Sequence, residues 1–268
     1  MSEELPIGVF DSGVGGLTVV KEIQDRLPHE SIIYLGDTAR VPYGNKSPET
    51  IQEYAIEITR FLVKKKVKAV VVACNTATAY SLDRLRELFT IPLLGVIEPG
   101  VGAALEATRG GKIGIIGTVG TIQSQAYQKA LLQAEPTLKI QALATPLLVP
   151  LVEEDWLDHP ATDMILKEYL NRMIEEQIDT LVLGCTHYPL LKPRILSLVQ
   201  DQIKLVDSAE NMAIALEKTL RSHDLLNQSQ ALGKTQIYVT DFSPRFQVLA
   251  ERFLKHPIGH LERISLES

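Results

Sequence analysis

Short, continuously apolar runs alternate with longer helical stretches along almost the whole chain, and this alternation constrains the fold most strongly. The apolar runs lack the regular change from apolar to polar residues that marks a half-exposed strand, so they indicate strands covered on both faces. Strands separated by helices form βαβ units with parallel strands. We therefore predict an α/β fold built on doubly wound, largely parallel sheets.

The expected elements follow from these runs. Strands are predicted at residues 7–10, 31–35, 69–73, 93–96, 113–116, 140–143, 180–183, 203–206 and 237–239. Helices are predicted at residues 17–26, 48–65, 77–89, 100–108, 124–133, 161–176, 191–200, 209–221 and 244–254.

An internal repeat indicates two copies of one module. Residues 7–15 (IGVFDSGVG) resemble residues 113–120 (IGIIGTVG), and residues 70–76 (VVVACNT) resemble residues 180–186 (TLVLGCT). We predict two pseudo-symmetric α/β domains that face each other across a central cleft. The first comprises residues 1–97 and is completed by 208–268, and the second comprises residues 98–207.

The two cysteines of the chain, Cys74 and Cys185, both lie at the carboxyl ends of predicted strands. Ligands of open α/β sheets bind beyond this end of the strands. Asp11 and Ser12 follow the first strand, and Thr118 follows the first strand of the second copy. In two facing domains, these side chains would border one cleft.

Two thiols on opposite sides of a substrate can invert a carbon centre. Racemising an amino acid requires removal of the α-proton from one face and return of a proton to the other, which two acid/base groups can accomplish. A cysteine has an ordinary pKa of about 8.5, so small local shifts populate the thiolate at neutral pH. We therefore expect one cysteine to act as the thiolate while the other carries the proton.

Several neighbouring residues suit this chemistry. Asn75, Thr76 and Thr186 begin predicted helices, where backbone N–H groups favour bound carboxylates. His187 could tune the thiol two residues before it, although a loop histidine bonded to backbone fits equally. Asp11 and Glu153 could accept a proton or a hydrogen bond, and Glu153 fits a surface acid as well as a functional one.

Other classes of site find no support in the sequence. The turn at residues 13–16 (GVGG) has neither the spacing of a dinucleotide motif nor the Gly-Lys-Ser/Thr of a phosphate loop. No lysine stands in a context that suggests a pyridoxal phosphate site, and no His and acid cluster has metal-ligand spacing. We expect no cofactor and no metal.

The charge pattern argues against nucleic-acid and membrane partners. The net charge is −6, and no apolar run is long enough to span a bilayer. The basic cluster of Lys64, Lys65, Lys66 and Lys68 is expected to be a solvated helix end. The N-terminal residues lack the features of a signal peptide, so a cytoplasmic location is expected.

Four motifs carry a family resemblance. They are VFDSGVGGLTV at residues 9–19, GDTARVPYG at 36–44, ACNTA at 73–77 and GCTHYPLL at 184–191. Together they resemble the motifs of bacterial glutamate racemases, in the aspartate/glutamate racemase family, and they occur in the same order. The sequence after Lys192 matches the family less closely.

The resemblance implies a cofactor-independent isomerase that interconverts L-glutamate and D-glutamate. Its product, D-glutamate, would supply peptidoglycan synthesis and thereby cell wall biogenesis and cell shape. Cys74 would take the α-proton from D-glutamate and Cys185 from L-glutamate, while Asp11 and His187 assist the thiols and Glu153 is a further candidate. The residues expected to bind the substrate are Asp11, Ser12, Pro42, Tyr43, Gly44, Asn75, Thr76, Thr118, Thr186 and His187.

Two alternatives and the oligomeric state stay open at this point. Aspartate racemase shares the two-thiol plan, but the His187–Tyr188 pair after Cys185 resembles the glutamate branch. A two-lobed small-molecule binding protein is the alternative from another class, and cysteines at paired strand ends argue against it. Members of the family are often dimeric in varying arrangements, so a homodimer is expected without a geometry.

Overall fold

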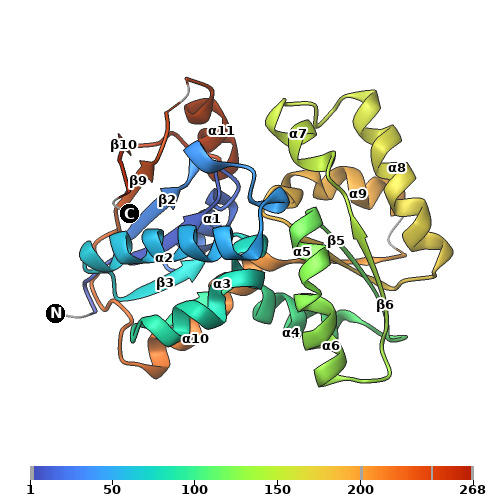
Figure 1. The fold of residues 1–268 in the computed structure, drawn as a ribbon, viewed down its shortest axis with the longest axis horizontal. Coiled ribbons are helices and arrows are strands. Elements are labelled where there is room, and N and C mark those ends of the chain that lie inside the picture. Colours follow the sequence, from blue (N-terminus) through green and yellow to red (C-terminus); the bar gives the residue numbers. More distant parts are fainter. Residues whose placement is uncertain (1–2, 200–201, 243, 267–268) are drawn as a thin grey trace. The chain divides into compact units, whose positions relative to one another are not determined.

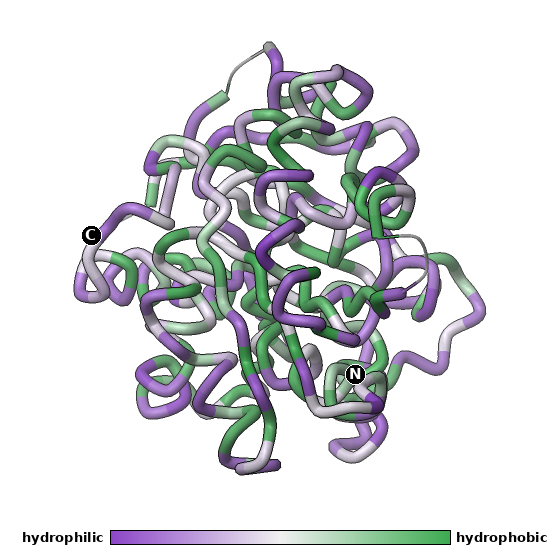
Figure 2. The backbone as a smooth tube through the Cα atoms, turned by 90° about the vertical axis from the view of Figure 1, so that its right-hand side faces the viewer, coloured by the Kyte–Doolittle hydropathy of each residue, from purple (hydrophilic) through white to green (hydrophobic). Residues whose placement is uncertain are grey.

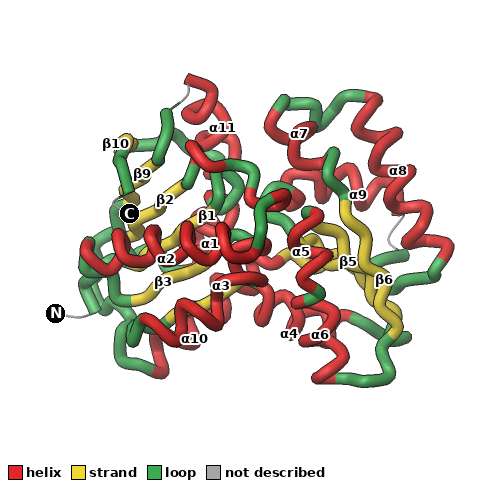
Figure 3. The backbone as a smooth tube through the Cα atoms, in the orientation of Figure 1, coloured by secondary structure: helices red, strands yellow, loops and turns green. Residues whose placement is uncertain are grey.

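The computed structural model describes residues 3–199, 202–242 and 244–266. The chain divides into two compact units, one formed by residues 1–96 and 209–268 and the other by residues 97–208. Each unit holds one sheet flanked by helices (Figure 1 and Figure 3). All strand pairs of both sheets within the described ranges are parallel, which confirms the predicted α/β class.

The first unit is built on a six-stranded sheet with the strand order β10-β9-β2-β1-β3-β4. Its strands are β1 (Ile7–Asp11), β2 (Ile32–Gly36), β3 (Ala69–Val72), β4 (Leu93–Gly95), β9 (Thr235–Val239) and β10 (His260–Arg263). Its helices are α1 (Leu17–Arg26), α2 (Pro48–Lys64), α3 (Asn75–Leu88), α10 (Ser208–Ser222) and α11 (Pro244–Leu254), with short 3-10 helices η1 (Thr38–Arg40) and η2 (Tyr43–Asn45).

Helices bury both faces of this sheet, which explains its continuous apolar runs. On one face, Phe10 of β1 and Val72 of β3 pack in a core cluster with Ile58 of α2. The preceding residues of these strands, Val9 and Val71, point to the other face of the sheet and are also fully buried. Hydrophobic (green) and hydrophilic (purple) stretches alternate along the tube in Figure 2.

The second unit is built on a four-stranded sheet with the strand order β6-β5-β7-β8. Its strands are β5 (Lys112–Gly117), β6 (Lys139–Ala144), β7 (Thr180–Gly184) and β8 (Lys204–Asp207). Its helices are α4 (Ile97–Ala107), α5 (Val119–Ser124), α6 (Ala126–Ala134), α7 (Leu148–Glu153), α8 (Pro160–Glu175) and α9 (Lys192–Val199), with the 3-10 helix η3 (Tyr188–Leu191).

The two sheets share one internal order, which bears out the predicted repeat. In the first sheet β1 lies between β2 and β3, with β4 next to β3. In the second sheet β5 lies between β6 and β7, with β8 next to β7. Strand β3 is therefore the counterpart of β7, and the chain leaves each of them toward one of the two cysteines.

Several elements differ from the sequence-based expectation. The short helices α5 and α7 and the edge strand β10 were not predicted. The helix expected at residues 124–133 begins later, because Gln125 adopts a left-handed conformation (φ 58°) that separates α5 from α6. The expected helix 191–200 begins at Lys192, and its last residue, Gln200, lies outside the described residues.

The expectation that Lys68 belongs to a solvated helix end is wrong. Lys68 lies beyond α2 and is only 5% exposed, with its Nζ 2.5 Å from Oε2 of Glu30. Its Nζ also donates to the carbonyl oxygens of Glu3 and Leu225. Burial lowers the pKa of Lys68, and the hydrogen bond and charge of Glu30 oppose that effect. Lys64, Lys65 and Lys66 are exposed, as predicted.

Within the part of the chain that the structure describes, no helix has both the length and the apolar composition needed to cross a membrane.

Candidate functional site

Cys74 caps the N-terminus of α3, directly beyond the carboxyl end of β3. Its side chain is 6% exposed, and its Sγ accepts a hydrogen bond from the backbone N–H of Ala77 at 3.4 Å. A helix N-terminus carries partial positive charge, so this position favours a negative charge on sulfur. Asn75 and Thr76 occupy the first two positions of the same helix and are buried beside the thiol.

Asp11 is the last residue of β1, the strand next to β3, and Ser12 follows it. The Cys74 thiol donates to Oγ of Ser12 at 3.8 Å, a long contact of the kind that sulfur makes. The Asp11 carboxylate is fully buried, and its Oδ2 accepts a hydrogen bond from the N–H of Gly13 at 3.0 Å. Gly16 permits this packing, because a Cβ there would lie 2.5 Å from Cβ of Asp11.

The segment predicted to bind substrate after β2 contains Pro42, Tyr43 and Gly44. A cis peptide bond joins Val41 to Pro42, and η2 begins at Tyr43. The Tyr43 side chain is only 1% exposed, and its hydroxyl donates to Oδ2 of Asp37 at 2.5 Å. The phenol is thus engaged inside the unit rather than at the surface of the loop.

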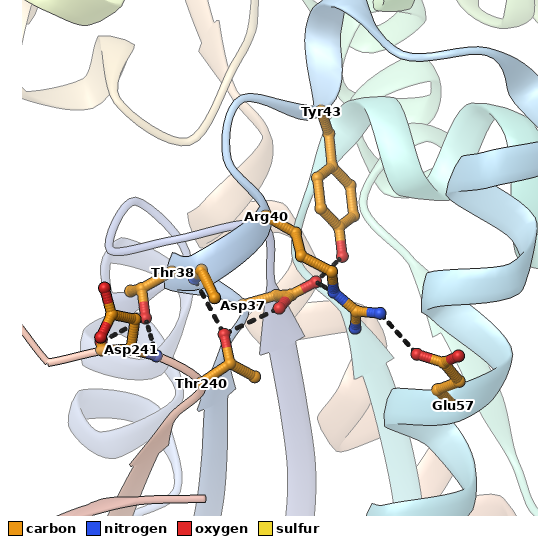
Figure 4. Close-up of polar contacts among 8 residues, drawn as sticks. Asp37, Thr38, Arg40, Tyr43, Glu57, Thr240 and Asp241 are labelled. Carbon is orange, nitrogen blue, oxygen red and sulfur yellow. Dashed lines mark hydrogen bonds and ion pairs between the residues drawn. The ribbon is translucent and has the colours of Figure 1, made fainter. Parts of the chain in front are cut away.

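Sequence reasoning missed the residues that surround this phenol. Asp37, Arg40 and Thr240 join Tyr43 in one hydrogen-bonded group (Figure 4). Asp37 and Arg40 lie inside the 36–44 motif but were given no role. Thr240 directly follows β9, so the strand-end rule that singled out Asp11 could have found it too.

In the second unit, Cys185, His187 and Glu153 form a chain of polar contacts. Cys185 directly follows β7 and is 6% exposed. Its Sγ lies 3.8 Å from Nδ1 of His187, and Nε2 of His187 lies 2.9 Å from Oε1 of Glu153. Glu153 ends α7, so this helix, which sequence analysis did not predict, brings the carboxylate to the histidine.

The imidazole of His187 is held in its protonated form by its two neighbours. Burial lowers the pKa of His187, but hydrogen bonds and charges from Cys185 and Glu153 outweigh burial and raise it to about 10. A cation next to sulfur can pair with a thiolate, which is the arrangement that activates cysteine in many enzymes.

Two further predicted residues lie at the same end of the second sheet. Thr118 caps the N-terminus of α5, and its Oγ1 accepts a hydrogen bond from the N–H of Thr121 at 3.2 Å. Thr186 lies between Cys185 and His187 and is 6% exposed. Both threonines therefore lie just beyond the ends of β5 and β7, in the region that the strand-end rule predicts for a ligand.

Buried phenols accompany each thiol but cannot serve as bases. Burial, followed by the charges of Asp11 and Cys74, raises the pKa of Tyr34 well above 10. In the second unit, burial and then the charge of Cys185 raise the pKa of Tyr188 well above 10. Both phenols therefore stay protonated at neutral pH, so neither can accept a proton there.

Among the residues that the structure describes, no group of three or more His, Cys, Asp and Glu side chains could hold a metal ion.

Known proteins resemble this chain in both sequence and fold. The family model described as Asp/Glu/Hydantoin racemase matches residues 16–216. A glutamate racemase of Geobacter metallireducens is 48% identical over 98% of this chain and 97% of its own length. The crystal structure of a glutamate racemase isoform of Bacillus anthracis matches with a TM-score of 0.95 and 43% identity, covering 98% of both chains. A glutamate racemase of Francisella tularensis, solved in complex with D-glutamate, matches with a TM-score of 0.93 and 38% identity over 99% of both chains.

The chain therefore belongs to the Asp/Glu/hydantoin racemase family, and it is an isomerase. Within that family its relatives place it with the glutamate racemases. The two-lobed binding protein considered from the sequence is wrong, and the relatives favour the glutamate branch over the aspartate alternative.

Proposed function

We propose that the protein interconverts L-glutamate and D-glutamate through two bases, Cys74 and Cys185, which act on opposite faces of the α-carbon without a cofactor. The observation that carries this proposal is the equivalent placement of the two thiols. Each follows the strand that pairs with the first strand of its sheet, β3 with β1 and β7 with β5. Each sulfur is also buried against a polar side chain, Ser12 or His187.

The reaction is a pair of balanced proton transfers. In the D-to-L direction, the Cys74 thiolate takes the α-proton, and the electron pair of the broken C–H bond stays on the α-carbon. The Cys185 thiol then gives its proton to the opposite face of that carbon, which yields L-glutamate. The reverse reaction starts from the exchanged protonation states, so a full cycle consumes no external proton.

The surroundings of each sulfur support a different part of this cycle. The protonated His187, backed by Glu153, offers positive charge to the Cys185 side. In the first unit, the N-terminus of α3 supports the Cys74 thiolate, and Asp11 is the acidic group at the end of the neighbouring strand β1. These residues are proposed to assist the thiols rather than to replace them as bases.

The substrate would be held by backbone and hydroxyl groups at the strand ends. A glutamate molecule has two carboxylates, and helix N-termini and hydroxyl groups are suited to bind them. We assign this role to the residues predicted from the motifs: Asp11, Ser12, Pro42, Tyr43, Gly44, Asn75, Thr76, Thr118, Thr186 and His187. For Tyr43 the contribution is that of the loop, because its hydroxyl is bound to Asp37.

We further propose that the enzyme works in the cytoplasm, where D-glutamate enters peptidoglycan synthesis and so supports the cell wall and cell shape. A homodimer stays a prediction.

Single replacement of each thiol tests the mechanism. In heavy water, Cys74→Ser and Cys185→Ser are each expected to abolish interconversion of the enantiomers. The Cys185→Ser variant keeps the base for D-glutamate and is expected to exchange only the α-proton of D-glutamate, whereas Cys74→Ser exchanges only that of L-glutamate. Proton NMR measures exchange, and circular dichroism measures inversion.

The outcome that contradicts the two-base mechanism is a variant that racemises at near wild-type rate with either thiol gone. The chain has no third cysteine to serve as a matched control, so an unchanged melting temperature must show that each variant is folded. Racemisation that persists after dialysis against a chelator, with no pyridoxal phosphate added, is expected, and its loss would contradict cofactor independence.

A further inference from the structure

We infer that Asp37 is a positioning residue that holds the loop of Pro42, Tyr43 and Gly44 in its binding conformation, and that Thr240 orients Asp37. This inference rests on the proposed function, because that function assigns the loop to glutamate binding. Through Thr240, the C-terminal segment of the chain, which resembles the family motifs less closely, would contribute to substrate affinity.

The Asp37 carboxylate is fully buried and bonded on both oxygens (Figure 4). Oδ2 accepts hydrogen bonds from Nε of Arg40 at 2.7 Å and from the hydroxyl of Tyr43 at 2.5 Å. Oδ1 accepts a hydrogen bond from the hydroxyl of Thr240 at 2.8 Å. A buried charge is tolerated only with such pairing, so the carboxylate fixes these three partners relative to one another.

Thr240 links the C-terminal part of the chain to the start of the loop. Its backbone N–H donates to the carbonyl of Gly36 at 3.2 Å, which continues the pairing of β9 with β2. Its hydroxyl also accepts a hydrogen bond from the N–H of Ala39 at 2.9 Å. The next residue, Asp241, exchanges two hydrogen bonds with Thr38 through its backbone. The strand end at β9 therefore holds residues 36–39 from one side.

Arg40 anchors the same segment from the other side. Its Nη1 donates to Oε2 of Glu57 on α2 at 2.5 Å, and its guanidinium carbon lies 3.9 Å from the centre of the Tyr54 ring. Burial opposes the charge of Arg40, but the hydrogen bond to Glu57 and the charge of Asp37 outweigh it and raise its pKa. The guanidinium is thus a permanent cation between α2 and the carboxylate.

The phenol of Tyr43 connects this anchored group to the loop. Burial and the neighbouring Asp37 raise the pKa of Tyr43 well above 10, so its hydroxyl remains a donor to Asp37 at any working pH. If the loop binds glutamate while the thiols carry out the chemistry, loosening the loop weakens substrate binding more than it slows proton transfer. The inference therefore predicts a rise in KM with a smaller change in kcat.

Thr240, which follows β9, and Thr235, which begins it, provide a matched pair of variants. Thr240→Val removes the hydroxyl beside Asp37, and we expect KM for both enantiomers to rise about tenfold with kcat changed less than about threefold. Thr235→Val makes the same replacement at the other end of β9, where the hydroxyl accepts a hydrogen bond from Gln24. Both threonines are partly buried, and we expect Thr235→Val to leave KM within about twofold of wild type.

Two further variants sharpen the result. Thr240→Ser keeps the hydroxyl and is expected to restore KM. Asp37→Asn keeps the shape of the side chain but turns an N–H group or a neutral oxygen toward its donors, and KM is expected to rise at least as far as in Thr240→Val. Should Asp37→Asn fail to fold, Thr240→Val still decides, because it leaves the bonds from Arg40 and Tyr43 in place.

The inference is overturned if folded Thr240→Val keeps the wild-type KM, or if Thr235→Val raises KM as much. A drop in kcat alone would also overturn it. The wild-type enzyme separates this outcome from failure of the proposed function: if it does not racemise glutamate, the proposed function fails, whereas an active wild type with unaltered KM in the variants rejects only the positioning role.

Discussion

Replacing Glu153 with glutamine tests whether its charge acts on the Cys185 side through His187. Oε1 of Glu153 lies 2.9 Å from Nε2 of His187, and Nδ1 of that ring lies 3.8 Å from Sγ of Cys185. Glutamine keeps the size of the side chain and an oxygen that can accept a hydrogen bond, but it removes the charge. The pKa of His187, which is about 10 despite burial, is therefore expected to fall.

The size of the expected decrease in the pKa of His187 follows from its contact with Glu153. A hydrogen bond to a charged group contributes about 1.5–3 kcal/mol and a neutral one about 0.5–1.5 kcal/mol, so the charge accounts for roughly 1–1.5 kcal/mol. The Glu153 side chain is 42% exposed, and solvent screening brings this to about 1 kcal/mol or less. One pKa unit corresponds to about 1.4 kcal/mol, so the pKa of His187 should drop by somewhat less than about one unit.

The sign for stability follows from the raised pKa of His187. Protonation of His187 contributes to the free energy of unfolding. This contribution is fully present below the unfolded-state pKa of about 6.5 and is lost as the pH rises through the folded-state pKa of about 10. In Glu153→Gln the loss occurs at a lower pH. We expect the alkaline limb of the kcat/KM profile to shift to lower pH as well, by somewhat less than about one pH unit.

The assay is the pH profile of kcat/KM between neutral pH and the alkaline limb, with NMR titration of the His187 ring as a direct measure of its pKa. Both directions of racemisation should change equally, because the two enantiomers have the same free energy. Glu154→Gln is the matched control, since it removes the same charge one residue along at an exposed position. An unmoved His187 titration in Glu153→Gln, or an equal shift in Glu154→Gln, would refute the reasoning.

Two predictions concern the stability of the fold. Lys68→Met leaves the buried Glu30 carboxylate without its cation and should lower the free energy of unfolding, measured by urea denaturation, by about 3–5 kcal/mol. Lys66→Met, at an exposed position, should change the free energy of unfolding by less than about 0.5 kcal/mol. Similar losses in the two variants would show that the ion pair adds nothing. Gly36→Ala places a Cβ 2.3 Å from the backbone oxygen of Gly13 and should destabilise the fold by about 1–3 kcal/mol or more. Gly102 lies in helix α4, where no atom beyond its chain neighbours and the helix backbone is within 4 Å of an added Cβ, so Gly102→Ala should stabilise the fold by about 0.5–1 kcal/mol. Equal melting temperatures for these two variants would contradict the steric argument.

The sequence predicted the strands whose side chains are buried on both faces, because burial leaves a continuous apolar run. It did not predict β10 (His260–Arg263), where mostly exposed polar residues form the edge strand and the pairing with β9 defines it. It also missed α7 (Leu148–Glu153), which has six residues and contains Pro150. Neither element carries a periodic pattern, so only the tertiary contacts specify it.

In the candidate site, too, residues placed by a single strand could be predicted, whereas contacts between distant segments could not. The strand-end rule located Cys74, Cys185 and Asp11 because their place depends only on the strand before them. Contacts such as that of His187 with Glu153 could not be predicted, because they depend on where the unpredicted α7 packs. Thr240 lies 203 residues from Asp37 along the chain, and only the pairing of β9 with β2 brings them together.

The pairing of β2 with β9 affects how the enzyme is synthesised. On the ribosome, β2 (Ile32–Gly36) emerges long before its neighbour β9 (Thr235–Val239), and the whole of the second unit is translated in between. Until the last segment leaves the exit tunnel, the nascent first unit has an apolar strand with one row of free amide and carbonyl groups, the kind of edge on which chains aggregate. A premature stop before β9 would therefore yield a product prone to self-association rather than merely a shorter enzyme.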